Sequence, residues 1–149
     1  MTVELTRAGP EDIDRLLPLV AAYHAFEQIG MRDTDRRRAL MPLLEGIPLG
    51  EVWLIGRREA PMGYIAFGLG WSIEFKGPDA FVDEIFLTEA ARGHGIGAAV
   101  LDAAVARLKA QGVVALHLEV ARGNDAAQDF YARHGFDRRD RYFLMTRTL

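Results

Sequence analysis

Glycines and an arginine gather in one short stretch of the chain, where a strand should give way to a helix. This glycine segment reads Arg92-Gly93-His94-Gly95-Ile96-Gly97, after an apolar run at residues 81–87 and before a helical pattern at residues 98–111. Glycine lets the backbone approach a ligand closely, and the first N–H groups of a helix attract anions. The amides from Arg92 to Ala98, with the Arg92 side chain, are therefore predicted to bind a pyrophosphate.

A dinucleotide-binding fingerprint is the alternative for glycines that precede a helix. That fingerprint follows the first strand of its unit, is spaced G-x-G-x-x-G, and has an acid about 20 residues later. Here the spacing is G-x-G-x-G, an arginine leads it, and the preceding strand is about the fourth. The glycine segment could also be only a flexible turn that binds no ligand. In that case Arg92 would brace the loop on a nearby carboxylate.

Two adjacent carboxylates, Asp83 and Glu84, interrupt the apolar run before the glycine segment. A carboxylate in such a place can take a proton from a substrate. In a regular strand the two side chains point to opposite faces, Glu84 with Phe86 and Asp83 with Leu87, and a bulge would exchange them. The sequence leaves open which one faces a substrate. An ion pair with an arginine is the structural alternative for at least one of them.

A second set of candidate residues lies on the last predicted helix. Tyr131 follows Asn124 by about two helical turns, and a phenol can donate a proton without being charged at neutral pH. The alternative for Tyr131 is packing in the core beside Phe130. Asn124 either contacts the ligand or caps the helix through its side chain. The set comprises Asn124, Ala127, Phe130, Tyr131, Gly135 and Phe136.

These residues need a scaffold, and the hydrophobic pattern predicts one of the α/β class. Segments with the period of a strand alternate with segments with the period of a helix. A short polar turn at Glu59-Ala60-Pro61 predicts an antiparallel hairpin. The predicted strands lie at residues 3–7, 52–55, 64–67, 71–75, 81–87, 113–120 and 142–145.

Four helices are expected between these strands. Pro10 suits the first helical turn, Asp33 or Thr34 is the expected cap of the second helix, and Pro42 should kink or interrupt it. The predicted helices begin near Pro10, at Asp33 or Thr34, near Gly97 and at Asn124, and the last two end at Gly112 and Gly135.

Length and composition limit the kind of protein. The 149 residues fit one domain, 1–149, and the chain has no cysteine, which excludes disulfides, thiolate metal sites and a cysteine-bound acyl intermediate. No apolar run reaches the roughly 20 residues that span a bilayer, and residues 1–10 do not resemble a signal peptide. We therefore expect a cytoplasmic protein that does not bind membranes.

The formal net charge of -3 gives no reason to expect a nucleic acid partner. The basic clusters at residues 36–38 and 138–139 have acids beside them, so we expect them to form solvated faces. His94 lacks a partner at metal-ligand spacing, and no metal is expected. Its amide should matter more than its ring, and Ile96 should fill the core.

Across residues 81–136 the chain resembles the GNAT superfamily, the N-acetyltransferases that use acetyl-CoA. The resemblance rests on Ile85-Phe86-Leu87, the glycine segment and the set that begins at Asn124. It implies an α+β fold with about four helices and a mixed sheet of about six or seven strands, splayed open between the strands of Leu87 and Val120. Pantetheine would pair with the backbone around Leu87, and the pyrophosphate would bind the glycine segment.

The resemblance also implies roles for the candidate residues. Asp83 or Glu84, directly or through water, would remove the proton of an amine whose ordinary pKa is about 10.4. The Leu87 amide would bind the oxyanion. Tyr131 would protonate the departing coenzyme A thiolate. Paired acids before Leu87 and the Phe130-Tyr131 pair are similar to those of polyamine acetyltransferases.

The acceptor is therefore expected to be a small cationic amine, with Tyr23, Glu27, Trp71 and Glu74 beside it. A peptide, a protein or an aminoglycoside remains an alternative acceptor. A sensor that binds acetyl-CoA without turnover is another class, and preferential binding of NAD would indicate an unrelated nucleotide module. Many GNAT proteins form homodimers through late strands, so residues 142–149 are where subunits could pair.

Overall fold

Five strands form one mixed sheet in the computed structural model, which describes all residues, Met1–Leu149. The strand order follows the chain, every neighbouring pair is antiparallel except the last, and β4 and β5 are parallel. The strands are β1 (Leu5–Arg7), β2 (Gly50–Ile55), β3 (Gly63–Ser72), β4 (Gly77–Leu87) and β5 (Ala115–His117).

Four α-helices accompany the sheet, and none is both long enough and apolar enough to cross a bilayer. The chain divides into two units, Met1–Leu118 and Glu119–Leu149. The first unit holds the sheet and three helices, and the second holds α4. The helices are α1 (Ile13–Phe26), α2 (Asp33–Leu44), α3 (Ile96–Ala110) and α4 (Asp125–Arg133), with short 3-10 turns η1 (Pro10–Asp12) and η2 (Glu89–Ala91).

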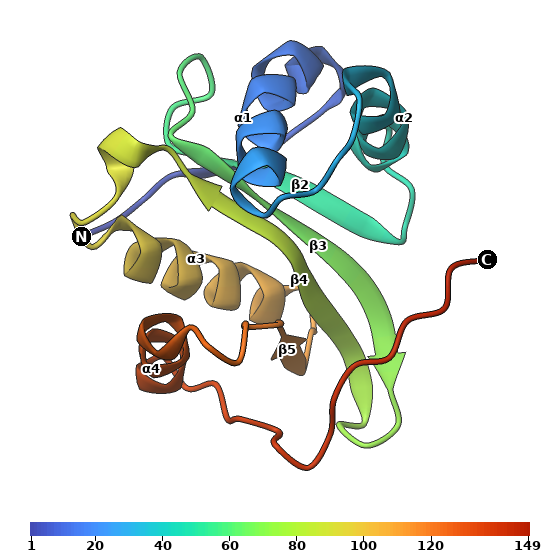
Figure 1. Ribbon diagram of the computed structural model, residues 1–149, viewed down its shortest axis with the longest axis vertical. Coiled ribbons are helices and arrows are strands. Elements are labelled where there is room, and N and C mark those ends of the chain that lie inside the picture. The colour runs from blue at the N-terminus through green and yellow to red at the C-terminus, as the bar shows by residue number, and fades with distance from the viewer. The chain divides into compact units, whose positions relative to one another are not determined.

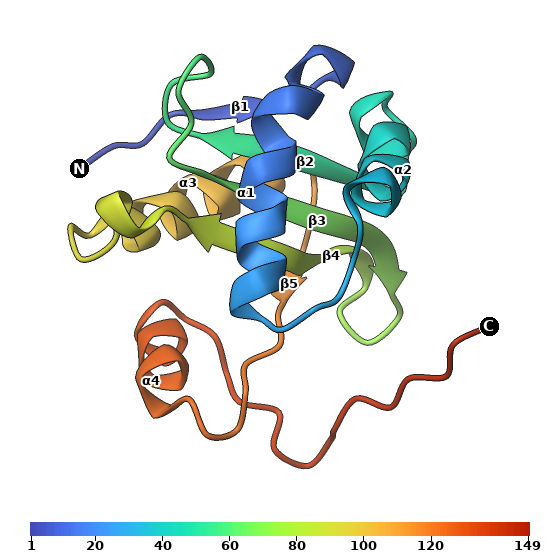
Figure 2. The ribbon, with the colours of Figure 1, turned by 45° about the horizontal axis from the view of Figure 1, so that its top comes forward.

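Helices cover both faces of the sheet in the first unit, and each face has its own apolar core. In Figures 1 and 2, α1 and α2 lie on one face and α3 on the other. Alternation along β3 divides its side chains between these cores, because successive residues of a strand point to opposite faces. Tyr64 and Ala66 pack with α1 and α2, whereas Ile65 and Phe67 pack with α3.

A bulge in β4 changes which residues face each core. Ala66 pairs with Glu84 and Phe67 pairs with Val82, so Asp83 is an extra residue on β4. Val82 therefore faces the α3 core together with Ile85, although the two are an odd number of positions apart.

Several strand predictions are wrong in extent or existence. Trp71 belongs to the end of β3, and a turn closed by the Lys76 amide and the Ile73 carbonyl follows it, so residues 71–75 are not a separate strand. The strand predicted at 113–120 shortens to β5. Residues 142–145 form no strand, and the Tyr142 amide donates to the Arg139 carbonyl in a turn. The sheet therefore has five strands rather than six or seven.

Some of the predicted helix ends are confirmed and others are wrong. Pro10 opens η1, directly before α1, as predicted, and Gly112 and Gly135 follow their helices with positive φ. The N-cap of α2 is Arg32, without a side-chain hydrogen bond, rather than Asp33 or Thr34. Pro42 lies inside α2, which continues to Leu44.

Candidate active site

The bulge at Asp83 decides where the two adjacent carboxylates point. Glu84 pairs with Ala66 and so lies on the α1 side of the sheet, as does Phe86. Asp83 is the extra residue of the bulge and is exposed. Glu84 is therefore the carboxylate that the structure places on the α1 side, and the bulge interrupts the regular alternation at Asp83.

Both oxygens of Glu84 accept hydrogen bonds from side chains on other elements. Tyr64 of β3 donates its hydroxyl to Oε1 at 2.8 Å, and Nε2 of His24 on α1 lies 2.7 Å from Oε2. Burial, the charge of Glu84 and this hydrogen bond raise the pKa of Tyr64, so its hydroxyl remains a donor. The carboxylate is thus held in one orientation, with its side chain 19% exposed.

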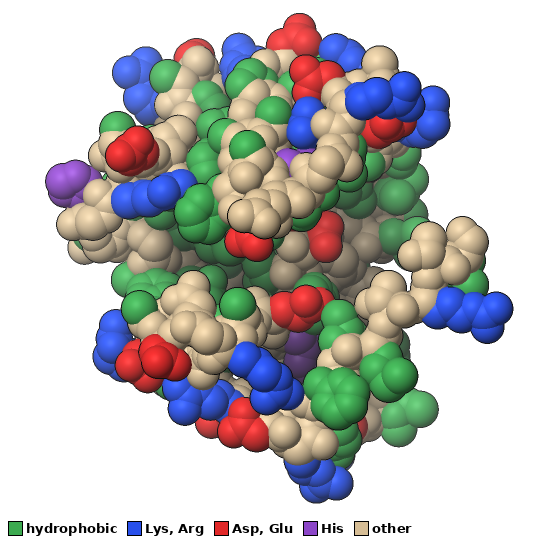
Figure 3. Space-filling view, in the orientation of Figure 1, with side chains coloured by type: hydrophobic (Ala, Val, Ile, Leu, Met, Phe, Trp, Pro, Cys, Tyr) green, Lys and Arg blue, Asp and Glu red, His purple; other side chains and the backbone are tan.

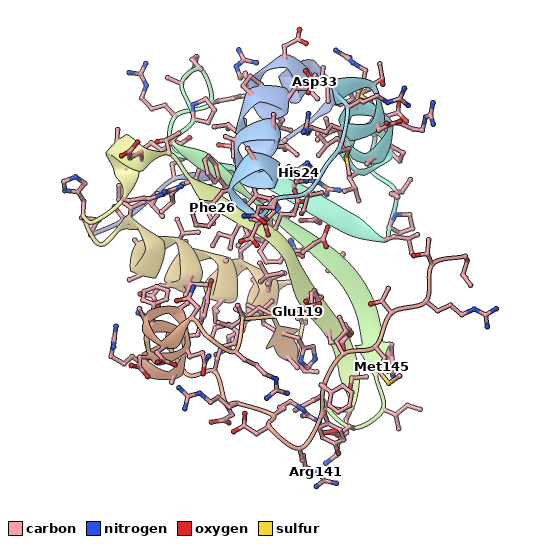
Figure 4. All side chains as sticks on the ribbon, in the orientation of Figure 1. His24, Phe26, Asp33, Glu119, Arg141 and Met145 are labelled. Carbon is pink, nitrogen blue, oxygen red and sulfur yellow. The ribbon has the colours of Figure 1, made fainter.

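His24 is itself oriented by an arginine from α2. Arg36 donates from Nε to Nδ1 of His24 at 3.1 Å and from Nη1 to Asp33 at 2.7 Å. An arginine nitrogen only donates, so Nδ1 accepts, and the proton of the neutral ring is assigned to Nε2. His24, which is 3% exposed, therefore donates to Glu84. Figure 4 shows His24 and Phe26 on the last turns of α1.

Aromatic rings surround this polar chain. The Tyr23 ring lies 6.4 Å from that of Tyr64 and 6.5 Å from that of Phe86, both edge to face. It also lies 5.9 Å from the His24 ring. Tyr23, predicted to contact the substrate, is thus brought next to the two residues that hold Glu84.

The glycine segment opens α3, as predicted. Gly93 and Gly95 have φ of 77° and 75°, which only glycine adopts readily, and Gly95 is the N-cap of a helix that begins at Ile96. No side chain caps this end, and a Cβ added at Gly93 or Gly95 would meet no atom within 4 Å. The first amides of α3 and the space before them therefore fit an anionic ligand. His94 is exposed and Ile96 packs against the α3 core.

Arg92 braces the end of β4 in the structure. Its Nε donates to the Leu87 carbonyl at 2.9 Å, and its guanidinium lies 5.4 Å from the centre of the Phe86 ring and 5.6 Å from that of Phe26. The sequence analysis gave bracing as the alternative to a phosphate contact, and it expected a carboxylate as the partner rather than a backbone carbonyl. Two of its three guanidinium nitrogens are not used in this hydrogen bond.

The Leu87 amide lies on the edge of β4 that faces away from β3. Thr88 donates to the Met62 carbonyl at 2.8 Å, and Leu87 is opposite Gly63. Hydrogen-bonding alternates along an antiparallel pair, so the Leu87 amide points away from β3. On that side β5 pairs with β4 only at Asp79–Phe81. The Leu87 amide therefore points away from its neighbour in the sheet, whereas the Leu87 carbonyl accepts from Arg92.

The other predicted substrate residues lie at two places in the fold, with Glu27 directly after α1 and with Trp71 and Glu74 at the end of β3 and in the turn after it. Glu27 is exposed at the end of α1, where its amide donates to the Tyr23 carbonyl. Trp71 is 70% exposed and lies five positions along β3 from Ala66, about 17 Å at the usual rise of a strand. Glu74 is in the turn beyond Trp71. Of these four residues, Tyr23 has a ring contact with Tyr64, which is a partner of Glu84.

In the second unit, Asn124 caps α4. Its Oδ1 accepts from the Ala127 amide at 3.1 Å, which is the capping alternative of the two that the sequence left open. The Tyr131 ring lies 5.3 Å from that of Phe130 and 5.6 Å from that of Phe136. Burial raises the pKa of Tyr131 above its ordinary 10.0, so the phenol keeps its proton at neutral pH.

The sequence placed His24 only in a segment expected beside the acceptor, and it did not point to Arg36 or Tyr64, although the structure connects all three to Glu84. His24 follows the buried Leu16 and Val20 at intervals of four residues, so the helical period gave a signal that it is buried. Arg36 was expected on a solvated face, and Figure 3 does show acidic and basic side chains interspersed over α1 and α2. The Arg36 side chain is nevertheless only 12% exposed, because it bonds to His24.

A family model and a sequence relative both identify the same protein family. A model of the acetyltransferase (GNAT) family matches residues 19–136. An uncharacterized N-acetyltransferase of Methanocaldococcus jannaschii is 35% identical over 142 residues, which are 93% of this chain and 62% of the archaeal protein. The chain thus spans slightly less than two thirds of the length of that relative.

Solved structures share the fold. An integron cassette protein from the mobile metagenome of Cole Harbour Salt Marsh has a TM-score of 0.83 at 30% identity, over 97% of this chain and 90% of that one. A protein from Clostridium acetobutylicum, described as a predicted acetyltransferase and solved with acetyl-CoA, has a TM-score of 0.76 at 18% identity, over 97% and 96%. The family model covers most of the chain, and the chain belongs to the GNAT acetyltransferase family.

Proposed function

We propose that this protein moves an acetyl group from acetyl-CoA to a primary amine by direct attack in a ternary complex. The observation that carries the proposal is Glu84, held between His24 and Tyr64 on the strand that ends at Leu87. Glu84 supplies a carboxylate of fixed orientation, three positions before Leu87, whose backbone an extended ligand could contact. Family membership supports acetyl-CoA as the cosubstrate.

The binding of acetyl-CoA is assigned to the glycine segment and the edge of β4. The pyrophosphate would accept hydrogen bonds from the amides at the start of α3, where Gly93 and Gly95 leave open space. The unused guanidinium nitrogens of Arg92 would contact the same phosphates. Pantetheine would pair with the backbone near Leu87. The protein of known structure that was solved with acetyl-CoA supports this choice of ligand.

Three steps make up the proposed reaction, and Glu84 begins it. Glu84 takes a proton from the acceptor nitrogen, and the nitrogen lone pair forms a bond to the thioester carbonyl carbon. The carbonyl oxygen gains negative charge, which the Leu87 amide would stabilise. The carbonyl double bond then re-forms as the carbon–sulfur bond breaks, the thiolate receives a proton from Tyr131, and the second proton of the acetylated nitrogen passes to the Tyr131 phenolate. The raised pKa of Tyr131 supports this role, since an acid must hold its proton beforehand.

The proposed acceptor is a small cationic amine of the polyamine kind. Two adjacent carboxylates, Asp83 and Glu84, favour a cation, and the rings of Tyr23 and Phe86 can contribute cation–π attraction. Peptide, protein and aminoglycoside amines are the alternative acceptors. A sensor that only binds acetyl-CoA is the alternative from another functional class.

Thiol release from acetyl-CoA tests the proposal against polyamines, aminoglycosides, amino acids and short peptides, with acetyl-CoA binding measured in parallel. Turnover with diamines or polyamines is the expected result. Turnover with another class alone would keep the reaction and replace the acceptor. Binding without any turnover would favour the sensor, and no binding of acetyl-CoA would overturn the proposal.

A further inference from the structure

Glu84 lies at one end of a chain of hydrogen bonds that starts on the exposed side of α2. Asp33 bonds to Arg36, Arg36 to His24, and His24 to Glu84, at 2.7, 3.1 and 2.7 Å. These contacts join three elements, α1, α2 and β4. Neither His24 nor Arg36 has a part in the reaction proposed above.

His24 cannot act as the base in this arrangement. Its Nδ1 accepts from Arg36, and its Nε2 carries the ring proton toward Glu84. Neither nitrogen has a lone pair free for a substrate amine. The ring is also 3% exposed, so a substrate would not reach it. His24 can affect the reaction only through Glu84.

We propose that Arg36 and His24 are positioning residues for Glu84, an inference that rests on the proposed function. Arg36 fixes the tautomer of His24 with its proton on Nε2. That proton bonds to Oε2 of Glu84, while Tyr64 bonds to Oε1. Each oxygen keeps one further lone pair, so a substrate amine meets a carboxylate that does not rotate. Such alignment is worth a large factor in rate, because a misplacement of about 1 Å can cost about 100-fold.

The groups that face the His24 ring support a neutral, oriented imidazole. Arg36 approaches from α2 and Glu84 from β4, and the Tyr23 ring of α1 lies beside it at 5.9 Å. A second proton, on Nδ1, would point at the guanidinium of Arg36. Without Arg36 the ring could take its proton on either nitrogen, and the bond to Glu84 would no longer be assured.

Four variants separate this role from a general effect on folding. Arg36→Met and Arg36→Leu remove the donor to Nδ1 and place an apolar side chain at a residue that is 12% exposed. His24→Leu removes the donor to Glu84, whereas His24→Gln keeps an amide N–H near the position of Nε2. The matched control is Arg37→Met, on the same helix, where the lost ion pair is with Asp14 at 3.4 Å. Circular dichroism and thermal unfolding identify any variant that fails to fold.

Nitrogen-15 NMR of the histidine rings tests the tautomer without any substrate, with the His24 signals assigned from His24→Gln. We expect the wild-type ring to carry its proton on Nε2 alone, the Arg37→Met ring to match it, and the Arg36 variants to lose this state. A wild-type proton on Nδ1, or unchanged signals in folded Arg36 variants, would overturn the role of Arg36. This result stands even if the protein acetylates nothing.

Steady-state kinetics with the amine identified above tests the consequence for Glu84. We expect kcat to fall about 10- to 100-fold in Arg36→Met and His24→Leu, with the acetyl-CoA Kd unchanged, and to recover to within about threefold in His24→Gln. Wild-type kcat in folded His24→Leu would overturn the positioning role. Absence of turnover in the wild type would instead refute the proposed function, and the NMR result would still decide the tautomer.

Discussion

Nε2 of His24 lies 2.7 Å from Oε2 of Glu84, although the two residues are 60 positions apart in the sequence. The contact joins the last turns of α1 to the bulge in β4. A buried histidine that donates to a half-buried carboxylate orders both side chains. The proposed base is therefore built by the packing of α1 on the sheet, and not by the strand alone.

Gly95→Glu should weaken acetyl-CoA binding by tenfold or more, on the order of 1.4 kcal/mol. The new carboxylate would stand at a helix N-terminus where the pyrophosphate is expected, and the φ of 75° would strain any side chain. Isothermal titration calorimetry measures the change. Gly95→Ala separates strain from charge, and Gly30→Glu, at an exposed glycine with open space, is the control. Unchanged affinity in Gly95→Glu would remove the segment from the binding site.

Tyr131→Phe should lower turnover by about 100-fold or more, the scale of a lost proton transfer, and leave acetyl-CoA binding nearly intact. Because the pKa of Tyr131 is raised, ionisation of Tyr131 should cause no loss of kcat at any pH up to 10.0, the ordinary pKa of a tyrosine. A pH series of kcat checks both. Tyr142→Phe, at an exposed tyrosine of the same unit, is the control. Wild-type turnover in Tyr131→Phe would take Tyr131 off the catalytic list.

Asp12→Asn should destabilise the fold by on the order of 2 kcal/mol. Asp12 is fully buried, and it accepts from the Gly9 amide at 2.9 Å and from Arg58 at 3.0 and 2.7 Å. Burial alone would raise the pKa of Asp12, but the hydrogen bonds of Arg58 and Gly9 and the charges of Arg58 and Arg15 outweigh it and lower the pKa below 3.8.

That lowered pKa fixes the sign of the pH dependence. The stabilisation is complete above the unfolded-state pKa and is lost as the pH falls from about 4 through the lowered folded-state pKa. Urea unfolding at several pH values should therefore show a wild-type advantage over Asp12→Asn that is full near neutral pH and shrinks in acid. Asp14→Asn, with a side chain 88% exposed, should have little effect at any pH. An advantage that grows in acid would contradict the account.

Local sequence signals predicted the parts of the fold that depend on short-range chemistry. The glycine segment, the start of η1 at Pro10 and the hairpin of β2 and β3 depend on backbone preferences, which act within a few residues. Residues 142–145 have the apolar composition of a strand but form none. A strand must pair with a neighbouring strand, and the composition of a segment does not show whether such a neighbour exists.

The candidate site depends on long-range contacts, and here the sequence predicted less. It identified Glu84 as a candidate base but could not tell its face, because a bulge is set by the pairing of β3 with β4. It could not find the bond of Arg36 to His24, since charge clusters are most often solvated. Trp71 was expected near the acceptor, and the observed register of β3 puts it far from Ala66.

The kcat of Glu84→Gln, with acetyl-CoA binding measured in the same preparation, tests the central claim most directly. Glutamine keeps the size, and its one oxygen can still accept from His24 while its amide nitrogen donates to the Tyr64 hydroxyl, but it cannot take a proton from the amine. Asp83→Asn, one position away at an exposed residue, is the matched control. The account predicts a loss of about 100-fold or more in Glu84→Gln with unchanged acetyl-CoA affinity, and a much smaller loss in Asp83→Asn. Turnover in Glu84→Gln equal to that of the wild type would contradict it.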